Sequence, residues 1–484
     1  MNRHITLVSA AALALATPMM GKLHAQSPAT RRAHELVALI GSATPASIKA
    51  YVDSAFSTRM RGLPMQAHIN FFMGQHEQTG GLDWVDVQTQ APTRTTALVK
   101  RKLTGELMAL LVDVEDAAPY RVAGVGQQRP QPKMAVAEPR LTNDADMAAA
   151  LQQYVGTLAK ADLFSGTVLL AKDGKTIYTG AFGQANKDFN APNNIDTKFN
   201  LGSMNKMFTA VTIAQLVEQG KLSYDDPLSK FIPDFPNAAA AQKIRIKHLL
   251  THTAGLGSYF NDEFEKSSRA RYRTVDEMLQ LARGDSLAFE PGTRWSYSNT
   301  GMLVLGKVIE VVTKQDYFDY VREHLYKPAG MASTDAYELD RVNPNLAVGY
   351  QKEYAEDGTK RFRNNIFMHV IRGGPAGGGY STAGDLLRFA EALKGGTLIR
   401  PATFELMTTP KPGVKSPEYG YGFGVDPQTN IVGHSGGFPG ISSNLDVFKG
   451  TGYVAVVMSN YGGASQPVVE KIRTLVRQRI APTP

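Results

Sequence analysis

The residues best suited to chemistry in this sequence form a Ser-x-x-Lys pair at the start of an apolar stretch. Ser203 precedes Lys206 by three positions, and mainly apolar residues follow from Met207 to Val217. If this stretch is helical, Ser203 lies in its first turn, where unpaired backbone N–H groups and the positive end of the helix dipole are found. Lys206 then shares a helix face with Ser203 and can act as a base or a stabilising cation. The pattern alone is weak, because an N-cap serine followed by a solvated lysine fits it equally well.

Two later segments add side chains of the kinds that a serine nucleophile needs. Residues 290–301 form a turn that leads into Tyr297 and Asn299, and an apolar helix is predicted after them. Residues 432–440 place His434 on a strand, and small residues up to Gly437 let a substrate backbone lie against that strand. Taken singly, the tyrosine could belong to the core, the asparagine could cap a helix, and the histidine could be bonded to a neighbouring strand.

In this order the three segments resemble those of the serine β-lactamase and penicillin-binding protein superfamily. The best match is its class C-like branch, which includes esterases, D-stereospecific aminopeptidases and D-alanyl-D-alanine carboxypeptidases. The resemblance covers essentially all of residues 140–484. Residues 244–256 and 377–386 also fit the family, and we interpret these two segments as architectural.

The resemblance implies a role for each matching residue. Ser203 would be the acylated nucleophile, and Lys206 and Tyr297 would form the base system, with the choice between them left open. A tyrosine has an unperturbed pKa near 10, and we expect the neighbouring lysine cation to lower it. Asn299 would orient the lysine and the acyl part of the substrate. The backbone N–H groups of Ser203 and Gly437 would form the oxyanion hole, and Tyr297 would activate the water for deacylation.

His434 departs from the pattern of true β-lactamases, in which the third motif typically begins with lysine. A histidine with a pKa near 6.5 is mostly neutral at pH 7 and holds a carboxylate less firmly than a lysine does. In the superfamily, histidine at this position is common among esterases and aminopeptidases. We therefore expect a serine hydrolase acting on an ester or a small peptide or amide with a compact acyl group. The alternatives are a β-lactamase, a D-alanyl-D-alanine carboxypeptidase, or a penicillin-binding-type sensor that is acylated without turnover.

The elements that must position these residues are predicted to form an α/β (α+β) domain over residues 140–484. An amphipathic helix at 145–158 and a hairpin at 165–182, with an Asp-Gly turn, begin the domain. A second hairpin at 442–460 and a helix at 467–480 end it. We expect one antiparallel sheet, built from both ends of the domain and flanked by helices, with an inserted helical subdomain.

A small α+β accessory domain is predicted before it, over residues 26–126. Helices at 33–40, 45–56 and 64–76 are followed by strands at 82–88, 95–103, 107–114 and 120–125. Helices followed by a meander resemble, weakly, nuclear-transport-factor-2-like or cystatin-like domains. We expect a structural or partner-docking module, joined by a Pro-containing linker at residues 127–139.

The first 25 residues predict a cleavable signal peptide. Arg3 is followed by an apolar run over residues 5–16 and by a small residue, Ala25, at the expected cleavage site. No later segment offers about 18 consecutive apolar residues. The sequence thus predicts a periplasmic or secreted protein without a membrane anchor.

Composition excludes several other kinds of site. The chain has 484 residues and no cysteine, which rules out a disulfide scaffold, a zinc-thiolate site and a cysteine nucleophile. It has no P-loop and no His-Glu-x-x-His signature, and its basic clusters lack the interleaved aromatic residues of a nucleic-acid module. We expect no metal, no cofactor and no nucleic-acid partner. The formal net charge of +8 identifies no partner, and the sequence does not indicate an oligomeric state.

Overall fold

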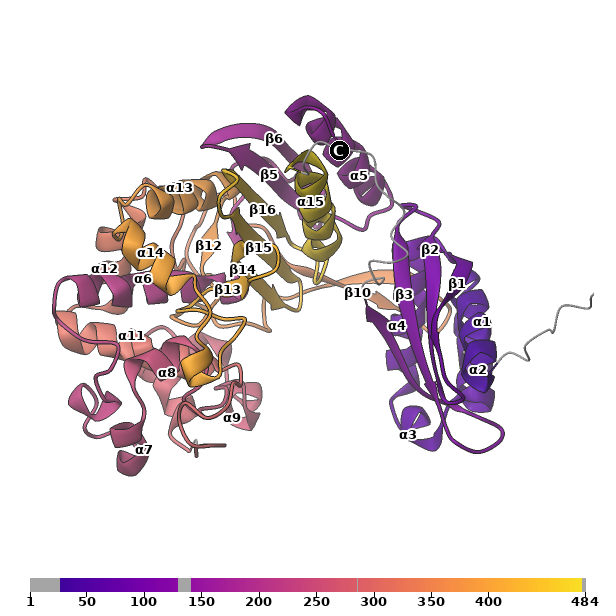
Figure 1. Cartoon of the computed structure of the whole chain (residues 1–484), viewed down its shortest axis with the longest axis horizontal. Helices are drawn as coiled ribbons and strands as arrows, with labels where there is room; N and C mark the ends of the chain where they lie inside the picture. The colour runs from indigo at the N-terminus through magenta and orange to yellow at the C-terminus, as the bar shows by residue number, and fades with distance from the viewer. Residues whose placement is uncertain (1–26, 129–140, 285, 481–484) are drawn as a thin grey trace, which may run out of the picture. The chain divides into compact units, whose positions relative to one another are not determined.

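A computed structural model of the chain describes residues 27–128, 141–284 and 286–480 (Figure 1). They divide into two compact units, one with residues 27–72 and 80–128 and the other with residues 73–79 and 141–480. The predicted signal peptide and most of the predicted linker lie outside the described residues. Residues 127 and 128, predicted as linker, form the end of a strand.

The first unit is built from helices followed by an antiparallel meander, as predicted. Serine and threonine caps followed by proline begin the first two helices, with Ser27 before one and Thr44 before the other. The first helix packs across three strands of the sheet through a buried apolar face that includes Leu36 and Ile40. The elements are α1 (Pro28–Gly41), α2 (Pro45–Ala55), α3 (Thr58–Arg61) and α4 (Met65–Thr79), whose residues 73–79 are grouped with the second unit, then β1 (Leu82–Gln90), β2 (Arg94–Arg101), β3 (Leu107–Val114) and β4 (Val122–Gln128). The strands lie in the order β1-β2-β3-β4.

A six-stranded antiparallel sheet forms the centre of the second unit, in the order β13-β14-β15-β16-β5-β6. The pairing of β16 with β5, in which Tyr453 is opposite Lys172, joins the two ends of the domain. The predicted sheet built from both ends is therefore confirmed. Its strands are β5 (Gly166–Lys172), β6 (Lys175–Phe182), β13 (Gly424–Asp426), β14 (Ile431–Phe438), β15 (Ile441–Phe448) and β16 (Tyr453–Ser459).

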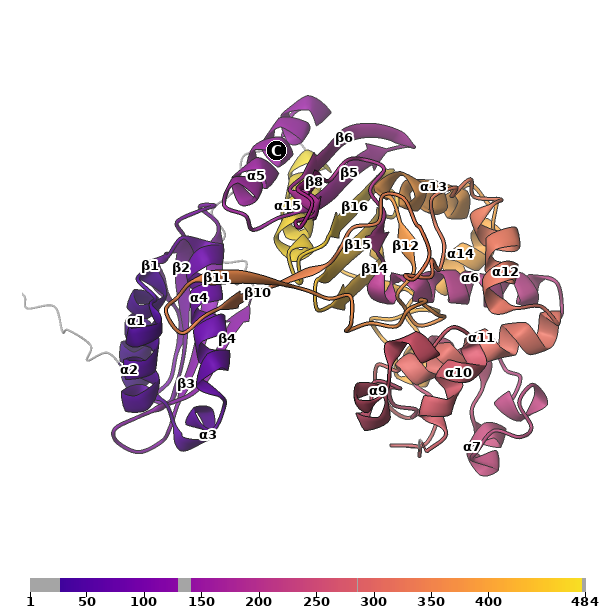
Figure 2. The same cartoon turned by 180° about the vertical axis from the view of Figure 1, so that it is seen from behind.

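Helices cover both faces of this sheet. On one face lie α5 (Asp144–Lys160) and α15 (Ser465–Ile480), which also pack against each other, and α13 (Ala383–Lys394) lies on the opposite face (Figures 1 and 2). The hydroxyl of Thr382 caps α13, since it accepts the backbone N–H of Asp385. Ser381 belongs to the short strand β12 (Tyr380–Ser381), and its hydroxyl is hydrogen-bonded to Thr334.

The inserted helical part lies between β6 and β13. Its central helix, α6 (Asn205–Glu218), is buried on all sides over its first ten residues, which explains the lack of polar periodicity in its sequence. A 3-10 turn, η2 (Gly202–Met204), comes directly before α6. The remaining helices are α7 (Ala238–Lys243), α8 (Ile246–Leu250), α9 (Asp262–Lys266), α10 (Val275–Leu279), α11 (Asn299–Thr313), α12 (Tyr317–Val321) and α14 (Pro401–Met407). The remaining strands are β7 (Gln184–Asn186), β8 (Ala191–Pro192), β9 (Phe199–Asn200), β10 (Tyr350–Tyr354) and β11 (Lys360–Asn364).

Across the described ranges, no helix is both long and apolar enough to cross a membrane.

Candidate active site

Ser203 lies in η2, immediately before the buried helix α6. Gly202 has a φ of +50°, a conformation that favours glycine, and its N–H donates to Asn200 Oδ1 at 2.9 Å. We predicted Ser203 in the first turn of the helix, but α6 begins two residues later, at Asn205. Lys206 lies in the first turn of α6 and is fully buried. The turn therefore presents a serine next to a lysine that has no access to solvent.

Three uncharged groups surround the amine of Lys206. Its Nζ atom lies 3.0 Å from Ser203 Oγ, 2.8 Å from Asn299 Oδ1 and 2.5 Å from the carbonyl oxygen of Ala376. Burial disfavours the charged form, and it lowers the pKa of Lys206 well below its usual value of 10.5. The neutral amine is thereby favoured next to the serine.

Tyr297 completes the group around the serine. Its side chain is hydrogen-bonded to Ser203, and Lys206 Nζ lies 4.7 Å from the centroid of its ring. Burial raises the pKa of Tyr297 to about 12, and the hydrogen bond to Ser203 opposes this only in part. Our expectation that the lysine would lower this pKa was wrong, because the buried amine favours its neutral form and burial penalises the phenolate.

Asn299 is held by the start of α11. Ser298 caps this helix, since its Oγ accepts the Gly301 N–H at 2.8 Å and donates to the carbonyl oxygen of Gly257 at 2.9 Å. Asn299 Nδ2 donates to Ser258 Oγ at 3.0 Å, which leaves its Oδ1 facing Lys206. The loop at residues 257–258 thus fixes the orientation of the amide.

His252 lies in the loop after α8, and its ring packs against that of Tyr297. Its side chain is fully buried, and its Nδ1 accepts the Ser298 N–H at 3.2 Å. Its ring centroid lies 4.4 Å from that of Tyr297 and 4.6 Å from that of Tyr419. Burial, followed by the proximity of Lys206, lowers the pKa of His252 well below 6.5. A packing role for a neutral histidine agrees with our interpretation of this segment as architectural.

His434 lies on β14 and is hydrogen-bonded on both ring nitrogens. Its Nε2 accepts from the hydroxyl of Tyr419 at 2.9 Å, and its Nδ1 donates to the carbonyl oxygen of Ser435 at 2.5 Å. Burial, with a smaller effect of Lys206, lowers the pKa of His434 to about 3. The side chain is therefore neutral at pH 7, and it brings no positive charge to the site.

The glycines of β14 bring this strand against the serine turn. A methyl group added at Gly436 would overlap the carbonyl oxygen of Leu201, and one added at Gly202 would come within 2.9 Å of the Gly437 nitrogen. The backbone nitrogen of Gly437 therefore lies beside the serine turn, where the sequence predicts an oxyanion hole.

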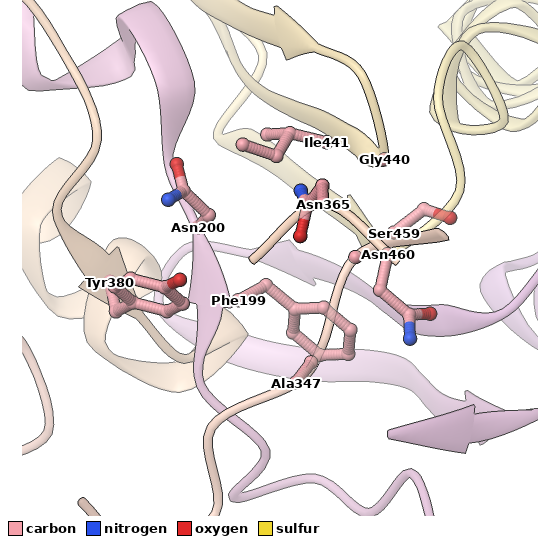
Figure 3. Close-up of a pocket in the computed structure, with 10 residues that line it drawn as sticks. Phe199, Asn200, Ala347, Asn365, Tyr380, Gly440, Ile441, Ser459 and Asn460 are labelled. Carbon is pink, nitrogen blue, oxygen red and sulfur yellow. The ribbon is translucent and has the colours of Figure 1, made fainter. Parts of the chain in front are cut away.

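A small polar cavity lies next to Asn200, at the end of β9, and Figure 3 shows the residues around it. Its volume is about 10 Å³, which is close to the space of a single water molecule and too small for a substrate. Asn200, which accepts the Gly202 N–H, is among its lining residues. The other lining residues are Phe199, Ala347, Gly349, Asn365, Tyr380, Gly440, Ile441, Ser459 and Asn460.

The structure brings all six predicted site residues to this one region, together with groups that the sequence did not reveal. Ser258 and Tyr419 belong to none of the three motifs, and their contacts come from the fold. Ala376 contributes only a backbone oxygen, which no residue type can signal. The glycines that flank it, Gly374 and Gly377, exchange backbone hydrogen bonds in a tight turn and were the only hint in the sequence. Within the described residues, no group of three or more metal-ligating side chains is placed to hold a metal ion.

Comparisons with known proteins agree with this arrangement. The family model described as beta-lactamase matches residues 147–478. Penicillin-binding protein 4* of Bacillus subtilis is 32% identical over 312 residues, covering 61% of this chain and 68% of that protein. The fold is similar to that of a penicillin-binding protein from Bacillus halodurans, with a TM-score of 0.61 and 29% identity over 66% of this chain and 99% of the other. A D-stereospecific amidohydrolase from Streptomyces sp. gives a TM-score of 0.56 and 28% identity, over 67% and 97% of the two chains.

The family model covers more than half of the chain, and the resemblance inferred from the three motifs is confirmed. This chain belongs to the β-lactamase family and is a serine hydrolase.

Proposed function

We propose that Ser203 is the nucleophile of an exported hydrolase that forms an acyl-enzyme with an uncharged ester or small amide substrate. The observation that carries this proposal is the set of hydrogen-bond partners of Lys206. The carbonyl oxygen of Ala376 and the amide oxygen of Asn299 can only accept hydrogen bonds. A neutral amine has two N–H groups for these oxygens, and its lone pair is then available to take the proton of the Ser203 hydroxyl, whose oxygen lies 3.0 Å away.

This arrangement favours Lys206 over Tyr297 as the base that takes the proton of Ser203. Burial lowers the pKa of the lysine and raises that of the tyrosine to about 12, so at pH 7 the tyrosine keeps its proton. A neutral phenol next to the nucleophile is suited to donate a proton to the leaving group. Our proposal therefore gives the two residues different roles.

The reaction then proceeds through a balanced sequence of proton transfers. Ser203 Oγ bonds to the carbonyl carbon while Lys206 takes its proton. The bond to the leaving group breaks as that group takes a proton from Tyr297, and the proton on Lys206 passes to the tyrosine oxygen. The same pair then activates a water that hydrolyses the acyl ester and restores the serine.

The backbone N–H groups of Ser203 and Gly437 are proposed to bind the oxyanion of the tetrahedral intermediate. The approach of the Gly437 nitrogen to the serine turn supports this assignment. One such donor lowers the barrier by ~3 kcal/mol, because it is already oriented toward the developing charge.

The neutral His434 supports an uncharged group on the leaving side of the substrate. A permanent cation at this position would hold a carboxylate, whereas a histidine with a pKa of about 3 carries no charge at pH 7. Esters and amides without a free carboxylate therefore fit better than β-lactams or D-alanyl-D-alanine peptides. The likeness to a D-stereospecific amidohydrolase supports amides as well as esters.

The test uses a fluorophosphonate probe and 4-nitrophenyl acetate with the full chain and the variant Ser203→Ala. We expect labelling and turnover by the wild type and neither by the variant. Ser54→Ala, in α2 of the first unit, is a matched control that should behave as the wild type. A wild type that is neither labelled nor active, or a variant that matches it, would contradict the proposal. A stable acyl adduct without turnover would instead support the sensor alternative.

Export is part of the proposal, and it is supported by the composition of the first 25 residues. We expect the protein recovered from outside the cytoplasm to begin at Gln26, which N-terminal sequencing or intact mass measures. Recovery of the uncleaved chain from the cytoplasm alone would contradict export and leave the proposed chemistry untouched.

A further inference from the structure

Aromatic side chains gather at one end of the strand that carries the predicted oxyanion hole. Phe438 follows Gly437 directly, and its ring centroid lies 5.7 Å from that of Phe260 with the planes 31° apart. Phe260 contacts Phe264 edge-on at 4.9 Å and Tyr259 at 4.6 Å. Nevertheless, Phe260 remains 40% exposed. Neighbouring aromatic rings thus hold the pair formed by Phe260 and Phe438 in place, while part of the Phe260 side chain stays exposed to solvent.

Hydrogen bonds connect this aromatic pair to the site. Ser258 Oγ accepts from Asn299 Nδ2 at 3.0 Å and from the Phe260 N–H at 3.4 Å. Phe260 is therefore joined through one serine to the asparagine that contacts Lys206. The loop that holds Phe260 thus also holds Asn299 through Ser258, so both side chains are positioned by the same loop.

A loop brings a further aromatic residue to the same region. Asn365 Nδ2 donates to the carbonyl oxygen of Pro439, next to Phe438, at 2.8 Å. Three residues later the carbonyl oxygen of Met368 accepts from Arg269 Nε at 3.3 Å, in the segment that follows α9. Phe367 lies between these two anchors and is 89% exposed. The chain on either side of this exposed phenylalanine is therefore anchored to Pro439, next to Phe438, and to Arg269.

The direction of the substrate along β14 follows from the position of the proton donor. The leaving group must lie next to Tyr297, whose ring centroid is 6.4 Å from that of His434. Side chains alternate along a strand, so His434 and Phe438 point to the same face, and at about 3.3 Å per residue they lie roughly 13 Å apart. With the carbonyl oxygen at Gly437, the leaving group extends toward His434. The acyl group therefore extends the other way, toward Phe438.

We propose that Phe260 and Phe438 form the acyl-group subsite, with Phe367 at its outer edge, and that this subsite selects an uncharged aromatic acyl group. The inference rests on the proposed function and replaces our expectation of a compact acyl group. Aromatic rings pack well against tilted or edge-on aromatic partners, and both geometries are present at Phe260. Neither Lys206 nor His434 offers a charge that would favour an anionic acyl group.

The test compares 4-nitrophenyl phenylacetate with 4-nitrophenyl acetate, which share a leaving group. For the full-length wild type we expect kcat/KM to be at least about tenfold higher for the phenylacetate, the discrimination that a fitted apolar pocket can reach. In Phe260→Ala and Phe438→Ala this ratio should fall by about tenfold, and Phe260→Leu should give an intermediate ratio. Because a ratio is measured on one preparation, a smaller folded fraction in a variant does not alter it.

Phe189→Ala provides the matched control, since Phe189 is 83% exposed and lies in the turn between β7 and β8. Its ratio should equal that of the wild type. A wild type that hydrolyses the acetate through Ser203 without preferring the phenylacetate would overturn the aromatic subsite and leave the proposed function standing. Unchanged ratios in both alanine variants would also overturn it. Failure of the proposed function would appear differently, as a wild type that reacts with neither ester nor the fluorophosphonate.

Discussion

Lys206 is surrounded by Ser203, Asn299 and Ala376, none of which carries a charge. A buried lysine without a carboxylate partner favours its neutral form, because desolvation penalises the ammonium. Tyr297 is 37% exposed, yet desolvation acts on its pKa with the opposite result, since its neutral form is the protonated one. At the scale of single residues, burial alone therefore separates a proton acceptor from a proton donor within one site.

This separation predicts different effects for Lys206→Met and Tyr297→Phe. Loss of the base should slow both fluorophosphonate labelling and amide hydrolysis by roughly 100-fold or more. Loss of the tyrosine should slow amide hydrolysis by a similar factor and labelling far less, because fluoride leaves without taking a proton. The rates of labelling and of turnover of an amino-acid amide measure this. Equal losses of labelling in the two variants would mean that Tyr297 is also needed to activate the serine.

The pH dependence of kcat/KM follows from the same two groups and from His434. Below its pKa, Lys206 is protonated and cannot accept the serine proton, so activity should rise with pH and level off well below pH 10.5. His434, with a pKa of about 3, should contribute no inflection between pH 5 and pH 8. A pH profile with 4-nitrophenyl acetate tests both statements. An inflection near pH 6.5 that disappears in His434→Gln would show that His434 titrates in this range and would contradict our interpretation.

At the scale of elements, the site depends on how closely β14 approaches η2. The backbone of Leu201 lies against Gly436, and the nitrogen of Gly437 lies beside Gly202. The start of α11 and the loop at residues 257–258 form the opposite side through Ser298 and Asn299. Each of these elements contributes one or two groups, and it is their packing that brings the groups within hydrogen-bond distance of one another.

Two neighbouring glycines of β14 should respond differently to alanine. Gly436→Ala places a methyl group against the Leu201 carbonyl and the Ser443 side chain, and overpacking of this kind lowers the free energy of unfolding by ~1–3 kcal/mol. The serine turn should shift, and labelling should slow by at least about tenfold. Gly437→Ala meets no atom within 4 Å and should leave the stability nearly unchanged. Thermal unfolding measures the stability of each variant, and the rate of fluorophosphonate labelling measures the effect on the serine turn. Equal stabilities of the two variants would contradict the close packing of Gly436 against Leu201.

At the scale of the whole molecule, every group of the candidate site belongs to the second unit. The most N-terminal of them is Asn200 and the most C-terminal is Gly437, and both lie well inside residues 141–480. The first unit has its own sheet and its own buried face in α1. Its likeness to nuclear-transport-factor-2-like or cystatin-like domains stays a prediction, and we propose that it is an accessory module.

Because every group of the site follows residue 141, we expect a chain that begins there, and so lacks residues 73–79 of the second unit, still to react with a fluorophosphonate at Ser203. The reason is that the hydrogen bonds around Lys206, Asn299 and His434 all have both partners within that chain. Circular dichroism and intact mass after labelling measure folding and reaction together. A folded but unreactive shortened chain would show that the first unit is needed for the chemistry.

The sequence by itself determined the family, the order of the three motifs, and the helices and strands of the first unit and of the two ends of the second unit. These depend on local patterns, such as the alternation of apolar residues in the two hairpins and the Ser-x-x-Lys spacing before an apolar helix. The elements of the first unit were also predicted, apart from the short helix α3 and shifts of a few residues at the ends. Such features were accessible because nearest neighbours along the chain produce them.

Only the tertiary structure decided which groups complete the site and how they are charged. Ala376 contacts Lys206 across 170 positions of sequence, and Ser258 and Tyr419 come from loops without a motif. The direction of the Tyr297 pKa shift was predicted wrongly for the same reason, because it depends on how deeply the ring and the lysine are buried. Burial and contact over long sequence separations arise from the packing of the whole chain, and local composition does not contain them.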